Sequence, residues 1–290
     1  MTIAPLTARS LLFAPGDSPR KLEKAGMSAA DLVIIDLEDA VADSAKADAR
    51  IAVAQHLGTT HRRQPHWVRI NPLDTPFALP DLAAVVPAKP DGIILPKATR
   101  ADAERLDHYL EALEATAGLP IGGIPVFVLA TETAQGVFDV GNYAGCPRLA
   151  ALSWGAEDSA TALGATSNRD DNGEYDFPYQ MFRALCLTGA AAAGVSAIET
   201  IHGDFRDAEG LDRMARKARR AGFRGMLAIH PDQVPVINAA FSPSPEEIAQ
   251  AERIVAAFDA NPGAGTVGLD GAMLDMPHLK RAKAVLAMKR

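Results

Sequence analysis

The chain has 290 residues, of which 48% are hydrophobic and 22% charged, a composition typical of a folded globular protein. A formal net charge of −7 argues against nucleic acid as the main partner, although a phosphorylated ligand needs only a local basic cluster. This length fits one (β/α)8 barrel of about 250 residues plus an extension, or two ordinary domains.

The two cysteines, Cys146 and Cys186, do not make a disulfide framework, so we expect a reducing, cytoplasmic location. The N-terminal MTIAPLTARS has no basic segment followed by an apolar one, and it is not expected to be a signal peptide. The longest uncharged apolar stretch, residues 184–198, is too short and too interrupted by glycine to span a bilayer. We therefore expect no membrane partner.

Eight short apolar runs recur along the chain, and helical segments separate most of them. They predict strands at residues 10–14, 32–36, 66–70, 91–95, 124–130, 149–154, 196–199 and 225–229. Strands that alternate with helices indicate a parallel sheet, and eight repeats favour a closed (β/α)8 TIM barrel over an open doubly wound sheet. No G-x-G-x-x-G follows the first run, which also argues against a dinucleotide-binding fold.

Local signals predict several of the helices between these strands. Ser18 and Pro19 are expected at the N-cap and first position of a helix over residues 19–27. Ser44 is expected to cap the second helix. The apolar positions of that helix recur at helical spacing and are Ala47, Ile51, Ala54 and Leu57. Further helices are expected over residues 101–116, 134–140 and 243–258, the last of them capped by Ser244.

The composition changes near the C-terminus. Residues 261–265, NPGAG, read as a linker, and the tail over residues 269–290 is amphipathic and basic at its end. We therefore expect a barrel domain in residues 1–260 and a C-terminal helical extension in residues 261–290.

A carboxylate follows each of two neighbouring expected strands. Glu132 comes after residues 124–130, and Asp158 comes after residues 149–154. The carboxyl ends of parallel strands meet at one rim of a barrel, where the βα loops build sites. Two carboxylates with little basic charge nearby suit a hard divalent cation that keeps several waters. Other polar residues expected on this rim are Asp17, Glu38, Asp39, Arg69, Lys97, Asp204 and His230.

Arg69 closes an otherwise apolar strand, and two explanations stay open for it. It forms a buried ion pair with Glu38 or Asp39, or it binds a substrate carboxylate through a bidentate clamp. Two explanations also stay open for Arg20 and Lys21, which lie either on a solvated helix face or where phosphates meet the rim.

Two further residues have simple structural explanations. Trp154 is expected in the core, because it ends a buried apolar run. Asp275 stands in Met-Leu-Asp-Met-Pro, and on composition it is an N-cap before Pro277.

These motifs resemble the HpcH/HpaI aldolase superfamily, in the branch of citrate lyase beta subunits and their stand-alone relatives. Those relatives include malyl-CoA and citramalyl-CoA lyases and malyl-CoA thioesterases. The matching stretches span nearly the whole chain in order, and they are specific to the family rather than to a substrate. They are RSLLFAPG (9–16), IDLEDAV (35–41), VRIN (68–71), LPK (95–97), ETAQG (132–136), GAED (155–158), AIHP (228–231) and LDGAMLDMPH (269–278).

The resemblance implies a TIM barrel, a magnesium ion and an acyl-CoA ligand. Glu132 and Asp158 stand where the family holds the metal. Arg69 stands where its members hold the carboxylate of a keto acid. Glu38 and Asp39 fall on the acidic pair near the metal, so Arg69, Glu132 and this pair are the expected substrate-binding residues.

The resemblance also implies roles at the two ends of the chain. Arg20 and Lys21 fall in the region that meets the CoA phosphates. Asp275 falls on a tail aspartate that a neighbouring subunit contributes near the reacting carbon, which implies a lid and a homo-oligomer, commonly a trimer or hexamer. Met226 and Ala272 replace two lysines that the family often has, so two positive charges expected near the CoA phosphates are missing.

The expected reaction is Mg²⁺-dependent cleavage, or the reverse formation, of a 3-hydroxyacyl-CoA of the malyl-, citramalyl- or citryl-CoA type. The products are an acyl-CoA and a 2-keto acid, and the expected catalytic residues are Arg69, Glu132 and Asp275. Three alternatives stay open. They are a malyl-CoA-type thioesterase at the same site, a CoA-independent aldolase acting on a hydroxy-keto acid, and a carrier-dependent subunit of a citrate lyase complex.

Overall fold

The computed structural model describes residues 3–59 and 61–289, and the chain forms two compact units, Met1–Asn238 and Ala239–Arg290. The two units meet between Asn238 and Ala239, within helix α9 (Gln233–Phe241), and the domain boundary that the sequence suggests at residue 260 stays a prediction. Within the described residues, no helix combines the length and apolar character that crossing a membrane requires.

The first unit is built on eight parallel strands that close into a barrel, with β8 paired to β1. The strands are β1 (Ser10–Pro15), β2 (Leu32–Asp36), β3 (His66–Arg69), β4 (Gly92–Leu95), β5 (Val126–Leu129), β6 (Leu149–Ser153), β7 (Ser196–Glu199) and β8 (Gly225–Ala228). Each strand coincides with one of the predicted apolar runs to within two residues at either end. The predicted (β/α)8 barrel is therefore confirmed.

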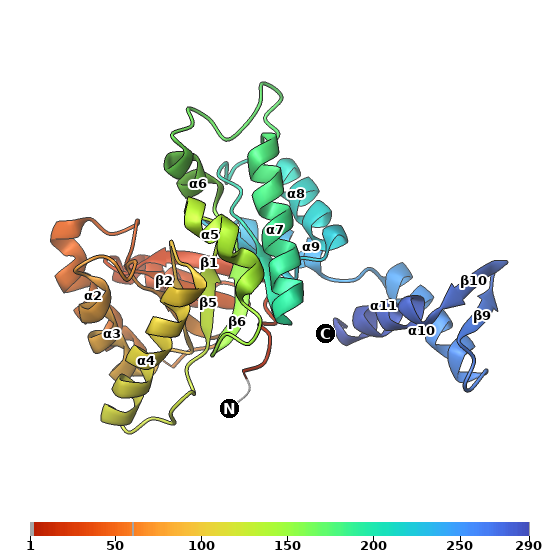
Figure 1. The fold of residues 1–290 in the computed structure, drawn as a ribbon, viewed down its shortest axis with the longest axis horizontal. Coiled ribbons are helices and arrows are strands. Elements are labelled where there is room, and N and C mark those ends of the chain that lie inside the picture. Colours follow the sequence, from red (N-terminus) through yellow and green to blue (C-terminus); the bar gives the residue numbers. More distant parts are fainter. Residues whose placement is uncertain (1–2, 60, 290) are drawn as a thin grey trace. The chain divides into compact units, whose positions relative to one another are not determined.

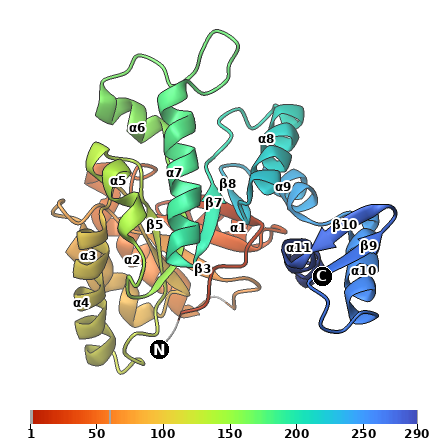
Figure 2. The same cartoon turned by 45° about the vertical axis from the view of Figure 1, so that its right-hand side comes forward.

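Helices surround these strands, as Figure 1 shows for α2, α3 and α4 and Figure 2 for α7 beside β7. In chain order they are α1 (Pro19–Gly26), α2 (Lys46–Thr59), α3 (Ala78–Val85), α4 (Arg100–Thr116), α5 (Ala134–Asp139), α6 (Ala156–Leu163), α7 (Phe177–Ala193), α8 (Ala208–Ala221) and α9 (Gln233–Phe241). Short 3-10 turns lie at Asp43–Ala45, Val86–Ala88 and Val140–Asn142.

Side chains from every strand fill the barrel, as expected for a packed core rather than a pore. One buried cluster includes Leu11, Leu32, Ile34, Trp67, Ile94, Phe127, Leu129, Ala151, Ile198 and Leu227. The packing is tight at Gly92, where an added Cβ would lie 2.3 Å from the ring of Trp67. Strand β4 therefore begins with the one residue that leaves room for this indole.

The start of α2 differs from the sequence-based prediction. Ser44 does not cap the helix, because it lies inside the preceding 3-10 turn and α2 begins at Lys46. Lys46 is buried, and its ammonium donates to the backbone carbonyls of Leu37 and Glu38 at 3.1 and 2.9 Å. This contact fixes the helix start and supports the loop after β2. Ile51, one of the apolar positions at helical spacing, faces solvent with 55% of its surface exposed.

The C-terminal unit has a small core of its own. It contains α10 (Pro245–Asp259), a hairpin of β9 (Thr266–Leu269) and β10 (Ala272–Asp275), and α11 (Met276–Ala287). Phe258, Val267, Leu274 and Leu279 form its buried cluster. Ser244 caps α10 in a capping box, as predicted, whereas the hairpin is a feature that the sequence did not predict.

Candidate active site

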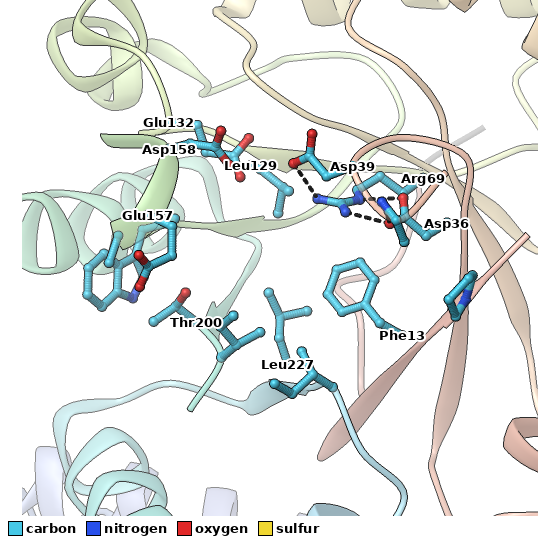
Figure 3. A pocket seen from close by; sticks show the side chains of 17 residues that line it. Phe13, Asp36, Asp39, Arg69, Leu129, Glu132, Glu157, Asp158, Thr200 and Leu227 are labelled. Carbon is cyan, nitrogen blue, oxygen red and sulfur yellow. Dashed lines mark hydrogen bonds and ion pairs between the residues drawn. The ribbon is translucent and has the colours of Figure 1, made fainter. Parts of the chain in front are cut away.

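A cavity of about 430 Å³ opens at the carboxyl ends of the barrel strands (Figure 3). This volume lies in the range of sites that bind small molecules. The residues that line it are Phe13, Pro15, Asp36, Asp39, Ala40, Arg69, Leu129, Glu132, Trp154, Gly155, Ala156, Glu157, Asp158, Thr200, Ile201, Leu227 and Ile229.

The charged residues of this rim lie on one arc, among apolar neighbours such as Leu129 and Trp154. The charged side chains stand at or just after the ends of β2, β3, β4, β5 and β6, and they form the charged arc. Strands β7, β8 and β1 supply an arc without charged residues, called the apolar arc here, which consists of Thr200, Ile201, Leu227, Ile229 and Phe13. Figure 3 shows Phe13 and Leu227 across the cavity from Glu132 and Asp158. A ligand in this cavity would meet carboxylates and cations on one side and hydrocarbon on the other.

Arg69, at the end of β3, is held by two acidic residues from the end of β2. Its Nε and Nη2 donate to the two carboxylate oxygens of Asp36 at 2.8 and 2.7 Å, and Nη1 lies 2.8 Å from Oε2 of Glu38. Burial opposes the guanidinium charge, but the carboxylates of Asp36, Glu38 and Glu132 outweigh burial and raise the pKa of Arg69. The buried ion pair expected for Arg69 is present, and it includes Glu38.

Asp36 is the main partner of Arg69, and it was not among the predicted site residues. Its carboxylate accepts two hydrogen bonds from the backbone N–H groups of Glu38 and Ala40, at 2.9 and 3.1 Å. Burial alone would raise the pKa of Asp36, yet the charge of Arg69 and these hydrogen bonds lower it. A signal existed in the sequence, because Asp36 is the charged end of an apolar strand and pairs directly with Arg69 in the parallel register.

Lys97, just after β4, connects the carboxylates that follow the neighbouring strands. Its backbone N–H donates to Oε2 of Glu132 at 2.8 Å. Its Nζ lies 2.5 Å from Glu38, 3.3 Å from Asp39 and 3.1 Å from Asp158. Burial would lower the pKa of Lys97, but the surrounding carboxylates raise it, so the ammonium stays charged. The sequence placed Lys97 on the rim without giving it a role.

Glu132 and Asp158 come from the ends of β5 and β6, as predicted. Burial raises the pKa of Glu132 to about 8, with further contributions from the charges of Asp158 and Glu38. Asp158 lies in the first turn of α6, with 28% of its side chain exposed. Gly155 makes room for Glu132, since an added Cβ would lie 2.7 Å from its Oε1.

The charges of this cluster suit a divalent cation. The five carboxylates described above, two of them exposed in part, face two side-chain cations, and burial together with the charges of Asp158 and Glu38 raises the pKa of Glu132. Carboxylate oxygens are the ligands that Mg²⁺ prefers, and a cation at Glu132 and Asp158 would relieve this excess of negative charge. The residues present therefore fit a magnesium ion.

A second buried network supports the wall of the cavity next to the charged arc. The indole of Trp154 donates to Oε1 of Glu199 at 2.6 Å, and Arg183 pairs with the other oxygen at 2.7 Å. Trp154 is fully buried, as predicted, and it also lines the cavity. Its ring meets that of Tyr175 edge to face, with the centroids 5.1 Å apart. Glu199 and Arg183 fix the orientation of this wall, and neither was predicted.

The remaining predicted residues lie elsewhere in the chain. Arg20 and Lys21 are exposed on α1 and do not line the cavity. Asp275 belongs to the C-terminal unit, where it caps α11 in a capping box with His278, so the N-cap prediction is confirmed. Met226 is fully buried in β8. A role for Arg20, Lys21 or Asp275 in ligand binding or catalysis stays a prediction.

Comparison with known proteins places the chain in a family. Residues 9–231 match the family model described as HpcH/HpaI aldolase/citrate lyase. The chain is 38% identical to a (3S)-malyl-CoA thioesterase of Cereibacter sphaeroides, over 96% of this chain and 93% of the relative. It is 33% identical to the mitochondrial citramalyl-CoA lyase of Rattus norvegicus, over 97% of this chain and 85% of the relative.

The fold matches a solved structure over almost its full length. Protein CitE from Mycobacterium tuberculosis, in complex with magnesium, acetoacetate and coenzyme A, superposes with a TM-score of 0.81 at 34% identity. The match covers 97% of this chain and 98% of that chain. The chain therefore belongs to the HpcH/HpaI aldolase/citrate lyase family and is an enzyme of that family.

Proposed function

We propose that this protein is a Mg²⁺-dependent carbon–carbon lyase that cleaves or forms a 3-hydroxyacyl-CoA of the malyl-, citramalyl- or citryl-CoA type. The products of cleavage are an acyl-CoA and a 2-keto acid. The observation that carries the proposal is the meeting of Glu132, Asp158 and Arg69 at one cavity. Relatives named as citramalyl-CoA lyase and citrate lyase beta subunit support it.

Glu132 and Asp158 are the residues that would hold the magnesium ion. When bound, Mg²⁺ supplies a Lewis acid that stabilises the negative charge developing on the substrate oxygen. Arg69 would bind the carboxylate of the keto acid, because its guanidinium lines the cavity and Asp36 holds it in a fixed orientation. With Nε and Nη2 bound to Asp36, the N–H groups that remain on the guanidinium would bind the substrate carboxylate without first losing side-chain freedom.

In cleavage a base takes the proton of the substrate hydroxyl, the carbon–carbon bond breaks and the bonding electrons form an enolate on the thioester fragment. The enolate carbon must then take up a proton. Asp275 would act as the acid/base at this carbon, contributed by the tail of a neighbouring subunit in a homotrimer or homohexamer. A hydrogen bond from His278 lowers the pKa of Asp275 and so favours the carboxylate, which would take a proton from the acyl-CoA carbon in the condensation direction. In cleavage the carboxyl, once protonated, would return that proton to the enolate carbon. Arg69 and backbone N–H groups of the rim would stabilise the enolate charge. Arg20 and Lys21 would meet the phosphates of CoA.

A thioesterase is the second candidate, because the chain is 38% identical to a (3S)-malyl-CoA thioesterase. In that reaction water attacks the thioester carbonyl, and the hydroxy-diacid leaves with its carbon skeleton intact. The same cavity and the same charged arc would serve both reactions, so the products distinguish them.

The test is incubation with malyl-CoA and citramalyl-CoA, with and without Mg²⁺, followed by mass spectrometry of the products. Acetyl-CoA with glyoxylate or pyruvate is the expected result. Free CoA with an intact hydroxy-diacid would establish the thioesterase instead. Glu132→Gln should lose turnover, whereas Glu111→Gln, on an exposed position of α4, should keep it. Absence of both product sets from Mg²⁺-loaded protein would contradict the proposal.

A further inference from the structure

The ammonium of Lys97 lies where three carboxylates converge. Its Nζ lies 2.5 Å from Oε1 of Glu38, 3.3 Å from Oδ2 of Asp39 and 3.1 Å from Oδ1 of Asp158. One positive charge therefore connects Asp158, a proposed metal ligand, to Glu38, which also contacts Arg69. Lys97 is thus in a position to influence the metal site and the arginine at the same time.

The backbone holds Lys97 in this place. Its φ of 49° lies in the left-handed region, which non-glycine residues rarely adopt. In this conformation its N–H donates to Oε2 of Glu132, while its side chain reaches Asp158. One residue therefore contacts both proposed metal ligands, one through its backbone and the other through its side chain.

We propose that Lys97 is a positioning residue that holds the carboxylates together in the metal-free protein and competes with the divalent cation for Asp158. The inference rests on the proposed function, because it takes Glu132 and Asp158 as the metal ligands. Cation binding would move Nζ away from Asp158 and leave it on Glu38 and Asp39. Lys97 would thereby limit the affinity of the site for Mg²⁺.

The geometry favours displacement over a permanent ion pair. Asp39 and Asp158 keep 58% and 28% of their side chains exposed, so solvent and cations reach both of them. A lysine side chain has four rotatable bonds and carries its charge at one end, which allows it to change partners. A unit charge 3.1 Å from a ligand oxygen also weakens the attraction of that oxygen for a second cation.

The experiment is a calorimetric titration of Mg²⁺ into metal-free wild type and Lys97→Met. Methionine keeps most of the length of the side chain and removes its charge. We expect Lys97→Met to bind Mg²⁺ about tenfold more tightly or better, from the Coulomb energy of one charge at this range. We also expect a lower melting temperature in EDTA, because the carboxylates lose their counter-charge.

Lys89→Met is the matched control. Lys89 also has a left-handed backbone, with φ of 60°, but it is exposed and lies outside the cavity. Its substitution should leave both Mg²⁺ affinity and stability in EDTA unchanged. If the wild type binds Mg²⁺ and Lys97→Met binds it with equal or lower affinity, the proposed competition by Lys97 is wrong. The metal site itself would still stand. A wild type that binds no Mg²⁺ would overturn the metal site and the proposed function with it.

A second measurement uses folded wild type and so does not depend on the stability of Lys97→Met. In protein labelled with ¹⁵N-lysine, one ammonium signal that is absent from Lys97→Arg should shift when Mg²⁺ is added. Signals of the other lysines should stay in place. A Lys97 signal that does not respond to saturating Mg²⁺ would show that the ammonium keeps its partners, and it would overturn the inference.

Discussion

Asp36 and Arg69 face each other in the parallel pairing of β2 and β3, and two hydrogen bonds of 2.8 and 2.7 Å join their side chains. The pair uses two nitrogens of the guanidinium and leaves Nη1 beside Glu38. The bidentate geometry expected for a substrate carboxylate is thus already used within the protein, where it fixes the direction in which Arg69 points.

Asp36→Asn should therefore reduce both activity and stability. The amide keeps the shape of the carboxylate but leaves a buried arginine short of its main counter-charge. We expect the free energy of unfolding to fall by about 3 kcal/mol and kcat/KM to fall by at least about tenfold. Denaturant unfolding and steady-state kinetics measure the two effects.

Asp31→Asn is the control for this change. Asp31 also holds an arginine, Arg9, through bonds of 2.8 and 2.9 Å, but it precedes β2 and does not line the cavity. The substitution Asp31→Asn should lower the free energy of unfolding and leave kcat/KM close to the wild-type value. Equal loss of activity in both variants would contradict a specific role for Asp36.

Gly155→Ala should damage the metal site without changing a charge. The new Cβ would lie 2.7 Å from Oε1 and 2.8 Å from Cγ of Glu132, so the carboxylate must move. We expect the affinity for Mg²⁺ to fall by about tenfold or more, as measured by calorimetry. Gly141→Ala is the control, because nothing lies within 4 Å of its added Cβ. Unchanged Mg²⁺ affinity in Gly155→Ala would argue against Glu132 as a ligand.

Mg²⁺ affinity should rise with pH up to about 8. Burial and the neighbouring carboxylates raise the pKa of Glu132 to about 8, and a metal ligand must be deprotonated. Calorimetry at pH 6, 7 and 8 should show tighter binding at each step and release of a proton. Affinity that does not change between pH 6 and 8 would contradict this prediction.

The stability of the metal-free protein should change in the opposite direction. The pKa of Glu132 is about 8 in the folded state, against roughly 4.3 in an unfolded chain, so the folded state binds the extra proton between these values. Its contribution to stability is present at low pH and is lost as the pH rises towards 8. Thermal unfolding in EDTA across this range, compared between wild type and Glu132→Gln, measures the difference.

The substitution Asp275→Asn should distinguish two roles of this residue, capping of helix α11 and proton transfer in catalysis. Asparagine caps helices as well as aspartate does, so α11 should keep its stability. If Asp275 transfers a proton, kcat should fall by about 100-fold or more. Ser244→Ala is the control, because it removes the capping box of α10. It should lower the free energy of unfolding by about 1 kcal/mol and change kcat little. Normal turnover by Asp275→Asn would rule out the catalytic role.

The barrel was predictable because its signals are local. Strand β2, for example, is found at the predicted residues, since a short apolar run buried on both faces is visible in the sequence. Helix α3 was not predicted, and part of what fixes it is distant in sequence. Its buried Asp81 accepts a bond from Asn71 at 3.1 Å and one from Arg50 at 3.0 Å. The hairpin did carry a signal, the dipeptide Asp270-Gly271, and both residues have the positive φ that a two-residue hairpin turn requires.

The site was predictable as a set of residues at one rim but not as a network. The positions of Glu132, Asp158 and Arg69 follow from the strand ends on which they stand. The partners of Lys97 do not, because they depend on a left-handed backbone and on side chains that follow three other strands. Hydrogen bonds between strands far apart in the chain leave no periodic pattern in the sequence.

The division of the rim into a charged arc and an apolar arc has a consequence for how new specificities could evolve. Changes in Thr200, Ile201, Leu227 or Ile229 alter the shape of the cavity, and these residues take no side-chain part in the ion pairs of the charged arc. Substitutions at the ends of these three strands could therefore change the substrate of the enzyme while the ion pairs of the charged arc stay unchanged. Directed evolution of this enzyme should begin with a library restricted to the ends of β7, β8 and β1.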